Sequence, residues 1–472
     1  MGESAPSADA ESSPCPSTPS KPHILPHLIN ITTTGDIILS VTFQTSIETL
    51  RRARKANLLN GSPAPPHALR PEVTVAYRVQ LDVLKTHSKY FASLLTNPGF
   101  QEASLINTVH AQLSARKTKP SEADPAELPR VKITDSDDAT QSAAREPIFE
   151  DMLRIIHQAP IKTTRVVMSY VTTLALLADR FDCCASVSRA LADIKFKWPV
   201  TNTRPYTDES GRATEAEKVL RQKILAAWLL GQPMRLHHAS RELVIRGSRL
   251  WGAYGQEHDC QGAWWHLPEG MEEELQYRRE CILDTISSIQ RHFLDLYSSR
   301  HRQCKLGYDS STACDSFQFG QMLRFLLSRH LLHLVDFAPS SLDKLPDTSM
   351  ADIDELLVTL KQCPNYQVDK HHTNCGLRIR IEPILDFVGA MVAAGVVAIP
   401  LADWKRRRSD VSWLNERVPL RNGRDEEVGS EVFAFTRTLA NDQRLRYEGA
   451  IYADKMARKL FTAGAWDWTP EA

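Results

Sequence analysis

The sequence predicts an α+β protein in which a small sheet with a helical cluster precedes a mostly α-helical C-terminal region. Three short segments, at 35–43, 73–79 and 130–134, alternate apolar and polar residues as half-buried strands do. From residue 148 onward, apolar residues recur almost only at helical spacing. The 472 residues are enough for two or three compact domains.

The first strand is expected to follow a polar tail. Residues 1–27 are rich in Ser, Pro and Ala, lack a signal-peptide pattern and are predicted to be disordered. A strand then runs from Gly35 to Phe43 and is entered from a turn. The basic, Pro-rich segment at 44–71 is expected to be a loop, and Val73 to Val79 a second strand.

Helices are expected directly after the second strand. Leucines from Leu81 to Leu95 have helical spacing, Ser88 is placed to cap a second short helix, and Asn97-Pro98-Gly99 ends it. The polar segment 103–129 is predicted to be an inserted loop. Further elements are expected in the order strand 130–134 and helices 148–156, 167–181 and 185–194. The N-terminal unit is therefore placed at 30–200 and a polar linker at 201–213.

The remaining residues, 214–472, are predicted to form a helical region. Its longest helix is expected from Glu272 to Tyr297, where apolar residues recur every seven positions and Arg279 interrupts the companion series, a pattern typical of ordinary helix packing. Other helices are expected near 220–229, 316–335, 350–361, 380–398 and 446–462. The apolar run from Ile384 to Pro400 is short for a membrane span and is interpreted as a buried core helix.

Five segments of the N-terminal unit resemble the motifs of one family, in the same order. They are Asp36 to Leu39, Val79 to Phe91, Phe100-Gln101-Glu102, Ile148 to Pro160 and Leu174 to Cys183. On these residues the chain resembles the BTB/POZ domain, a small α+β fold. His157-Gln158-Ala159 stands where the family has an aromatic-Thr-Gly turn, so this part departs from the pattern.

The resemblance is to a divergent type common in filamentous fungi, in which a helical region with a Cys-Gly-Leu-Arg segment follows; Cys375 to Arg378 matches it. It implies a protein that forms homodimers or recruits partners, among them cullin-type ubiquitin ligases or corepressors. The missing signal-peptide pattern and the spread of nine cysteines along the chain separately predict an intracellular location, in the cytoplasm or nucleus. The chain lacks a motif for the helical element that supplements cullin binding in many relatives, which weakens the ligase interpretation.

Composition argues against nucleic acid as a partner. Lys plus Arg and Asp plus Glu both number 57, so the formal net charge is zero, whereas nucleic-acid binders need excess positive charge. Two basic clusters, Arg51 to Lys55 and Lys405 to Arg408, are interpreted as solvated loops, with an import signal or a phosphate-contacting patch as the alternative for each. The tryptophans Trp251, Trp264 and Trp265 are expected to anchor a core or an interface.

Catalytic motifs are missing from the sequence, including the phosphate-binding loop, the dinucleotide-binding glycines, the serine elbow and His-Glu-x-x-His. Gly252 to Gly262 is Gly-bearing but does not join a strand to a helix. We therefore expect a protein that is not an enzyme.

Four cysteines of the C-terminal half are candidate metal ligands: Cys304, Cys314, Cys363 and Cys375, the last two bracketing His371 and His372. Thiolates and imidazoles suit tetrahedral zinc. Their spacings match neither Cys-x-x-Cys nor the usual finger patterns, so buried free thiols and no cofactor are the favoured interpretation, with zinc as the alternative.

The sequence thus favours a protein-interaction adaptor that dimerises or recruits partners through its N-terminal unit. The first alternative is a transcriptional regulator that uses the same unit for dimerisation. The second alternative is an enzyme with an unrecognised site in the helical region.

Overall fold

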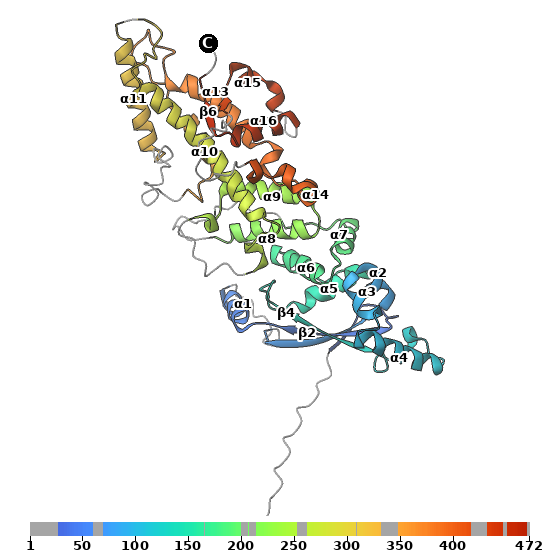
Figure 1. The fold of residues 1–472 in the computed structure, drawn as a ribbon. Helices are drawn as coiled ribbons and strands as arrows, with labels where there is room; N and C mark the ends of the chain where they lie inside the picture. The colour runs from blue at the N-terminus through green and yellow to red at the C-terminus, as the bar shows by residue number, and fades with distance from the viewer. Residues whose placement is uncertain are drawn as a thin grey trace, which may run out of the picture.

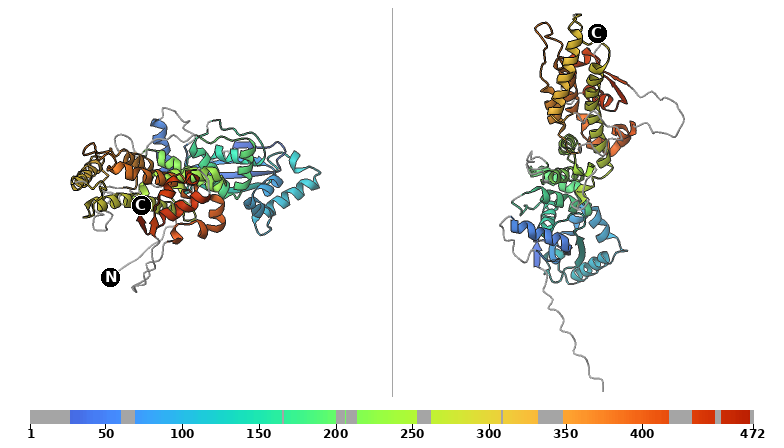
Figure 2. Two further views of the ribbon diagram at one scale, coloured as in Figure 1. Left: turned by 90° about the horizontal axis from the view of Figure 1, so that it is seen from above. Right: turned by 90° about the vertical axis from the view of Figure 1, so that its left-hand side faces the viewer.

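The computed structural model describes residues 27–59, 69–164, 166–199, 206, 214–252, 262–307, 309–331, 348–416, 432–446 and 451–469. It confirms the α+β class, with a mostly helical chain and a small mixed four-stranded sheet near the N-terminus. The sheet lies at one end of an elongated molecule and the last helices lie at the other (Figures 1 and 2).

The sheet has the order β1-β3-β2-β4. Its strands are β1 (His27–Asn30), β2 (Ile37–Gln44), β3 (Glu72–Val79) and β4 (Arg130–Ser136). The central strands β2 and β3 are antiparallel, whereas β1 runs parallel to β3 and β4 parallel to β2. Alternation sends Leu39 and Val41 into the main core of the unit, and Ile38 into a small cluster on the opposite face.

Gly35 is required where the chain enters β2. A Cβ atom at this position would lie 2.6 Å from Arg78 Cγ and 2.9 Å from Val79 N, so a larger residue would collide with β3. The next residue, Asp36, accepts a hydrogen bond from the Leu81 amide at 2.8 Å and so joins the start of β2 to the first helix after β3.

Helices cover the main face of the sheet. They are α2 (Leu81–His87), α3 (Lys89–Thr96), α5 (Glu146–Ile156), α6 (Met168–Arg180) and α7 (Cys184–Asp193). The predicted cap is confirmed: Ser88 Oγ accepts from the Phe91 amide at 3.0 Å and donates to the Phe181 carbonyl at 2.6 Å. Phe91 stacks on Phe181 with ring centroids 5.4 Å apart.

Two segments predicted to be loops contain helices, and those predictions were wrong. Helix α1 (Ile47–Leu59) lies within 44–71, and α4 (Gln101–Ala115) begins the segment 103–129. Helix α4 buries three apolar residues at helical spacing, Ala103, Ile106 and Leu113, which the surrounding polar residues disguise in the sequence. The predicted tail lies outside the described residues except for His27, which starts β1.

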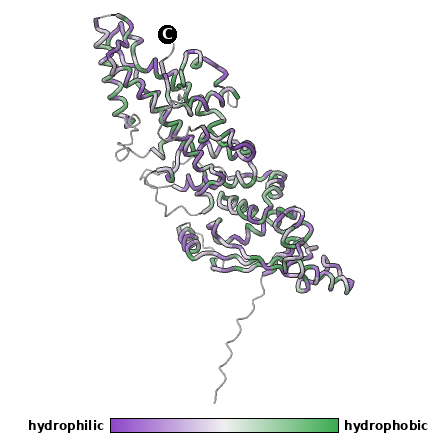
Figure 3. Tube along the Cα trace, viewed as in Figure 1, coloured by the Kyte–Doolittle hydropathy of each residue, from purple (hydrophilic) through white to green (hydrophobic). Residues whose placement is uncertain are grey.

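The helical region is built around α10 (Met271–Ser298), whose heptad positions Leu275, Ile282 and Ile289 are fully buried. The other elements are α8 (Ala216–Leu229), α9 (Pro233–Arg246), α11 (Ser311–Ser328), α12 (Ile353–Lys361), α13 (Leu377–Val392), α14 (Leu401–Val411), α15 (Arg437–Asn441) and α16 (Ile451–Phe461), with the short strands β5 (Val432–Ala434) and β6 (Ala465–Asp467). Hydrophobic and hydrophilic residues are interspersed along these helices (Figure 3), as expected for helices that bury one face.

The predicted core helix near Ile384 is α13, which ends at Val392; Ala394 and the segment from Val397 to Ile399 beyond it are buried. Within the part of the chain that the structure describes, no helix combines the length and hydropathy needed to cross a bilayer.

The two regions share buried surface. Helix α8 packs against α6, and its residue Ala226, with Leu230 just beyond its end, belongs to the core of the N-terminal unit. Trp264 and Trp265 form a small buried cluster with Leu225, against which Leu176 of α6 packs. Trp251 is partly buried and packs against the large core of the helical region, so the expectation that the tryptophans anchor a core or an interface is confirmed. The predicted linker lies outside the described residues except for Tyr206, which is buried.

Candidate interaction site

A groove opens on the N-terminal unit between the end of α5 and α7. It encloses about 700 Å³ and is lined by apolar side chains that include Ile155, Ile156, Ile161 and Ala190. Ile194 also lines the groove and is 55% exposed. A partly open apolar floor of this size is typical of a site that binds a small molecule or a short segment of another protein.

Polar side chains edge the groove. His87, Ser186, Arg189 and Asp193 line it together with the apolar residues. Arg189 and Asp193 are exposed and carry opposite charges, so the edge has no single sign of charge. An apolar floor with a polar rim is the general anatomy of a protein-binding surface.

One wall of the groove is fixed by His157, directly after α5. Its Nδ1–H donates to the Leu153 carbonyl at 2.8 Å, and its Nε2 accepts from the Gln80 amide at 3.2 Å. Burial lowers the pKa of His157 below its usual value, and both ring nitrogens are satisfied in the neutral form. The next residue, Gln158, has φ 58° and turns the chain sharply into the groove wall.

The loop after that turn is held by Asp151. This fully buried carboxylate accepts hydrogen bonds from the Lys162 amide at 2.8 Å, the Thr163 amide at 3.3 Å and the Tyr170 hydroxyl at 2.9 Å. Burial, together with the charge of Asp151, raises the pKa of Tyr170, so this hydroxyl remains a donor. The loop is therefore tied to α5 and α6.

The other wall, α7, is attached to both regions of the molecule. Ser186 Oγ donates to the His87 carbonyl at 3.0 Å, which joins α7 to α2. Ser188 Oγ donates to the Leu230 carbonyl at 2.6 Å, which joins α7 to the end of α8. Hydrogen bonds thus fix both walls of the groove. A surface that is already fixed loses little conformational entropy when a partner binds.

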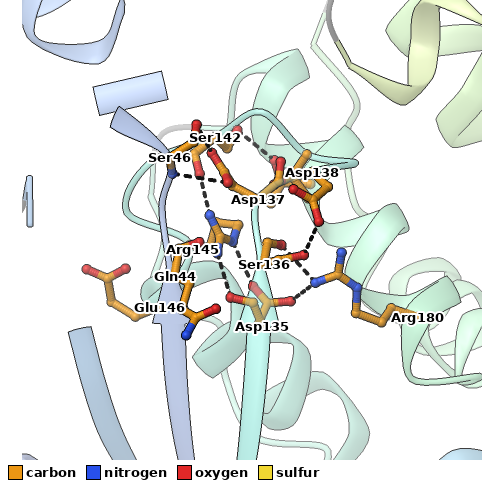
Figure 4. Close-up of polar contacts among 12 residues, drawn as sticks. Gln44, Ser46, Asp135, Ser136, Asp137, Asp138, Ser142, Arg145, Glu146 and Arg180 are labelled. Atoms are coloured by element: carbon orange, nitrogen blue, oxygen red, sulfur yellow. Dashed lines mark hydrogen bonds and ion pairs between the residues drawn. The ribbon is translucent and has the colours of Figure 1, made fainter. Parts of the chain in front are cut away.

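A second polar centre lies at the ends of β2 and β4 (Figure 4). Arg145 Nε donates to Asp135 Oδ2 at 2.7 Å with both side chains fully buried, and Arg180 forms an ion pair with the other carboxylate oxygen. Arg145 also donates to the carbonyls of Gln44 and Ser142, each at 2.8 Å. The arginine therefore joins β2, β4 and the start of α5, and its role is structural.

Asp137 continues this centre at the start of α1. Burial opposes its charged form, but hydrogen bonds from Thr49 and from the amide and hydroxyl of Ser46 lower the pKa of the carboxyl below its usual value. The lowered pKa keeps Asp137 ionised, so it holds the first turn of α1 against the end of β4.

Three of the four cysteines proposed as metal ligands lie together. The donor atoms of Cys304, Cys314 and Cys375 lie within 4.8 Å of one another and of the His372 ring. Cys363 is instead buried in the large core of the helical region, where burial raises the pKa of its thiol to about 11. The structure thus puts His372 in the place that the sequence assigned to Cys363.

The basic clusters form helix surfaces rather than loops. Arg51 to Lys55 lie on α1, and Lys405 to Arg408 lie on α14. Lys405 Nζ lies 4.4 Å from the centre of the Trp228 ring and donates to the Trp228 carbonyl at 3.3 Å. These contacts of Lys405 therefore help to pack α14 against α8. Of the segment from Gly252 to Gly262, only the two terminal glycines lie within the described residues.

The comparisons with known proteins add no relative: no family model, no curated protein and no solved structure matches the chain.

Proposed function

We propose that residues 30–200 form a BTB/POZ-type domain and that the chain is a protein-interaction adaptor. The residues that carry the sequence resemblance contact one another in the core of this unit. Asp36 bonds to the Leu81 amide, and Ser88 bonds to the Phe181 carbonyl. A shared motif set is more informative when its members meet in space, because each then supports the same packing.

The observation that carries the adaptor function is the groove between α5 and α7. Its lining combines the buried Ile155 and Ile156 with exposed charged side chains and the exposed Ile194. Its occupant is a short segment of another protein that presents a few apolar side chains flanked by charges of both signs. Arg189 and Asp193 pair with those charges at the rim, where ion pairs give specificity more than affinity.

The helical region contributes a second surface in this proposal. Because α7 bonds to the end of α8, a partner in the groove is held at a fixed orientation to the helical region. This arrangement suits an adaptor that brings two proteins together. Cullin-type ligases and corepressors are the partner classes implied by the resemblance.

The test is affinity purification of the full chain from cells that produce it, with two matched variants. Ile194→Glu introduces a charge at the groove, whereas Ile47→Glu introduces the same charge at an isoleucine of α1 that is also more than half exposed. We expect Ile194→Glu to lose co-purifying proteins at least about tenfold and Ile47→Glu to retain them. Equal retention by both variants contradicts the groove as the docking surface.

Association with a second copy is a separate part of the proposal. Strands β1 and β4 are the edges of the sheet, and edge strands can pair across a two-fold axis. Light scattering of the purified full chain tests this. A dimer mass supports homodimerisation, and a monomer mass at all concentrations contradicts it while leaving the groove proposal intact.

A further inference from the structure

Three thiols and one imidazole from three separate segments converge at the far end of the helical region. Cys304 lies in the loop after α10, Cys314 in the first turn of α11, and His372 and Cys375 in the turn that precedes α13. We refer to these four residues as the Cys3His cluster. Cys304, Cys314 and His372 are buried, and Cys375 is 9% exposed.

The spacing of three donor atoms, those of Cys304, Cys375 and His372, fits the edges of one tetrahedral site, and Cys314 Sγ lies within 4.8 Å of each of them. With zinc bonds of about 2.3 Å to sulfur and about 2.05 Å to nitrogen, the edges of a tetrahedral site are about 3.8 Å between sulfurs and about 3.5 Å between sulfur and nitrogen. The Cys304 and Cys375 sulfurs are 3.7 Å apart, and they lie 3.4 and 3.6 Å from His372 Nδ1. A disulfide would need sulfurs about 2.05 Å apart.

His372 is oriented as a metal ligand. Its Nδ1 faces the sulfurs, and its Nε2 lies 3.0 Å from Ser310 Oγ. When Nε2–H donates to this hydroxyl, Nδ1 is deprotonated and its lone pair points into the cluster. Metal-binding histidines are generally held in this way by a hydrogen bond at the other ring nitrogen.

Ser310 supplies an independent sign of this arrangement. It occupies the N-cap position of α11, where a serine normally accepts a hydrogen bond from the first turn. Its side chain makes no capping hydrogen bond and contacts His372 instead. The Ser310 side chain therefore fixes the imidazole of His372 instead of capping α11. This arrangement is expected if the imidazole binds a metal ion.

Two carboxylates shape the loops that carry the ligands. Asp315, next to Cys314, accepts from the amides of Gln303 and Cys304 at 2.8 and 2.9 Å. Asp369 accepts from the His372 amide at 3.1 Å. A carboxylate thus holds the backbone of each loop that carries cluster residues. These hydrogen bonds position the four side chains of the cluster.

We propose that Cys304, Cys314, His372 and Cys375 bind a zinc ion in a four-coordinate structural site. Three thiolates and one neutral imidazole are a donor set that selects zinc over magnesium or calcium, and four protein ligands leave no position for a reacting water. Such a site carries a net charge of −1, and Arg380, which donates to the Gln303 carbonyl at 2.9 Å, is a nearby cation. The site does not depend on the proposed adaptor function.

The ion would add bonds between parts of the fold that also meet through side-chain packing. The three cysteines form a small buried cluster of their own, separate from the large core of the helical region. One zinc ion there ties the end of α10, the start of α11 and the turn before α13. Structural zinc sites contribute directly to folding stability, so its removal is expected to release α11 first.

The test measures metal in the full chain, expressed with zinc and dialysed against metal-free buffer. Elemental analysis is expected to find about one zinc per chain. Cys314→Ser and His372→Ala are expected to lower zinc content at least about tenfold. The matched control Cys363→Ser, a buried thiol outside the cluster, is expected to retain it. A metal-free chain, or equal zinc in all three variants, overturns the proposal.

Two further measurements keep the test decisive if the cluster variants fail to fold. Ser310→Ala leaves every ligand in place and is expected to weaken zinc binding by about 10- to 100-fold, as loss of a partner to a ligating histidine does elsewhere. Cobalt(II) bound to the unaltered chain is expected to show the intense bands of tetrahedral coordination with sulfur. A weak octahedral spectrum, or unchanged affinity in Ser310→Ala, contradicts the site.

Discussion

Arg279 Nη1 donates to the Val244 carbonyl at 2.8 Å, so an arginine buried in α10 closes the last turn of α9. It also donates to the carbonyls of Ile245 at 2.9 Å, Thr348 at 2.7 Å and Ala351 at 2.6 Å. A cation at a helix C-terminus interacts favourably with the unpaired carbonyls and the helix dipole. The residue that interrupts the heptad pattern in the sequence is thus a central support of the helical region.

Replacement of this arginine is expected to destabilise the helical region. Arg279→Met keeps most of the volume but leaves four carbonyl groups without their charged donor, and hydrogen bonds to charged groups contribute about 1.5–3 kcal/mol each. We expect a loss of at least about 3 kcal/mol in the free energy of unfolding, measured by urea denaturation followed by circular dichroism. Arg406→Met, at an exposed arginine of α14, is the control, with an expected change within about 0.5 kcal/mol.

The ion pair between Arg145 and Asp135 is expected to stabilise the N-terminal unit. Loss of one partner of a buried pair generally costs about 3–5 kcal/mol, and Arg145→Met is expected near the lower end because Arg180 still pairs with Asp135. Urea denaturation of the full chain measures the change.

The control for that variant is Arg116→Met. Its partner Glu127 lies 3.3 Å away, and both side chains are largely exposed, so a change below about 1 kcal/mol is expected. Similar losses in Arg145→Met and Arg116→Met would show that the buried pair has no special role.

Stability of the groove wall is expected to fall in mild acid because of His157. Burial lowers its folded-state pKa below the value of about 6.5 that applies in the unfolded chain. As the pH falls through about 6.5, the unfolded state binds a proton that the folded state does not, so folding is favoured less. Protonation of His157 would also place a hydrogen on Nε2, facing the Gln80 N–H that donates to this nitrogen in the neutral form.

The measurement for His157 is the melting temperature at about pH 7.5 and about pH 5.5. We expect the unaltered chain to lose stability between these values and His157→Gln to lose less. His301→Gln, at an exposed histidine, is the control and is expected to keep the full pH dependence. An equally steep dependence in His157→Gln contradicts the assignment to His157.

The sequence predicts the regular elements of the N-terminal unit well where one face is strongly apolar. Helix α5 buries Phe149, Met152 and Leu153 in a short segment, and its helical spacing is unmistakable. Helix α4 buries three small or medium apolar residues among polar ones, so its pattern resembles that of a loop. Strand β1 has only four residues and is defined by its pairing with β3, which no local pattern reveals.

The Cys3His cluster shows the same limit for a site. Spacing along the chain favoured Cys363 beside Cys375, because the two bracket a histidine pair. The structure instead brings together His372 and Cys375, which have the spacing of a Cys-x-x-Cys ligand pair with an imidazole in place of one thiol. That signal was present, but only the fold shows that Cys304 and Cys314 join it and that Cys363 does not.

The central claim, that the N-terminal unit binds other proteins through its groove, is tested most directly by hydrogen exchange. The full chain is compared with and without the protein that co-purifies with it most strongly. The account predicts slower exchange at the end of α5, in residues 157–161 and in α7, with little change on α1. Protection confined to the helical region, with the groove exchanging as in the isolated chain, would contradict it.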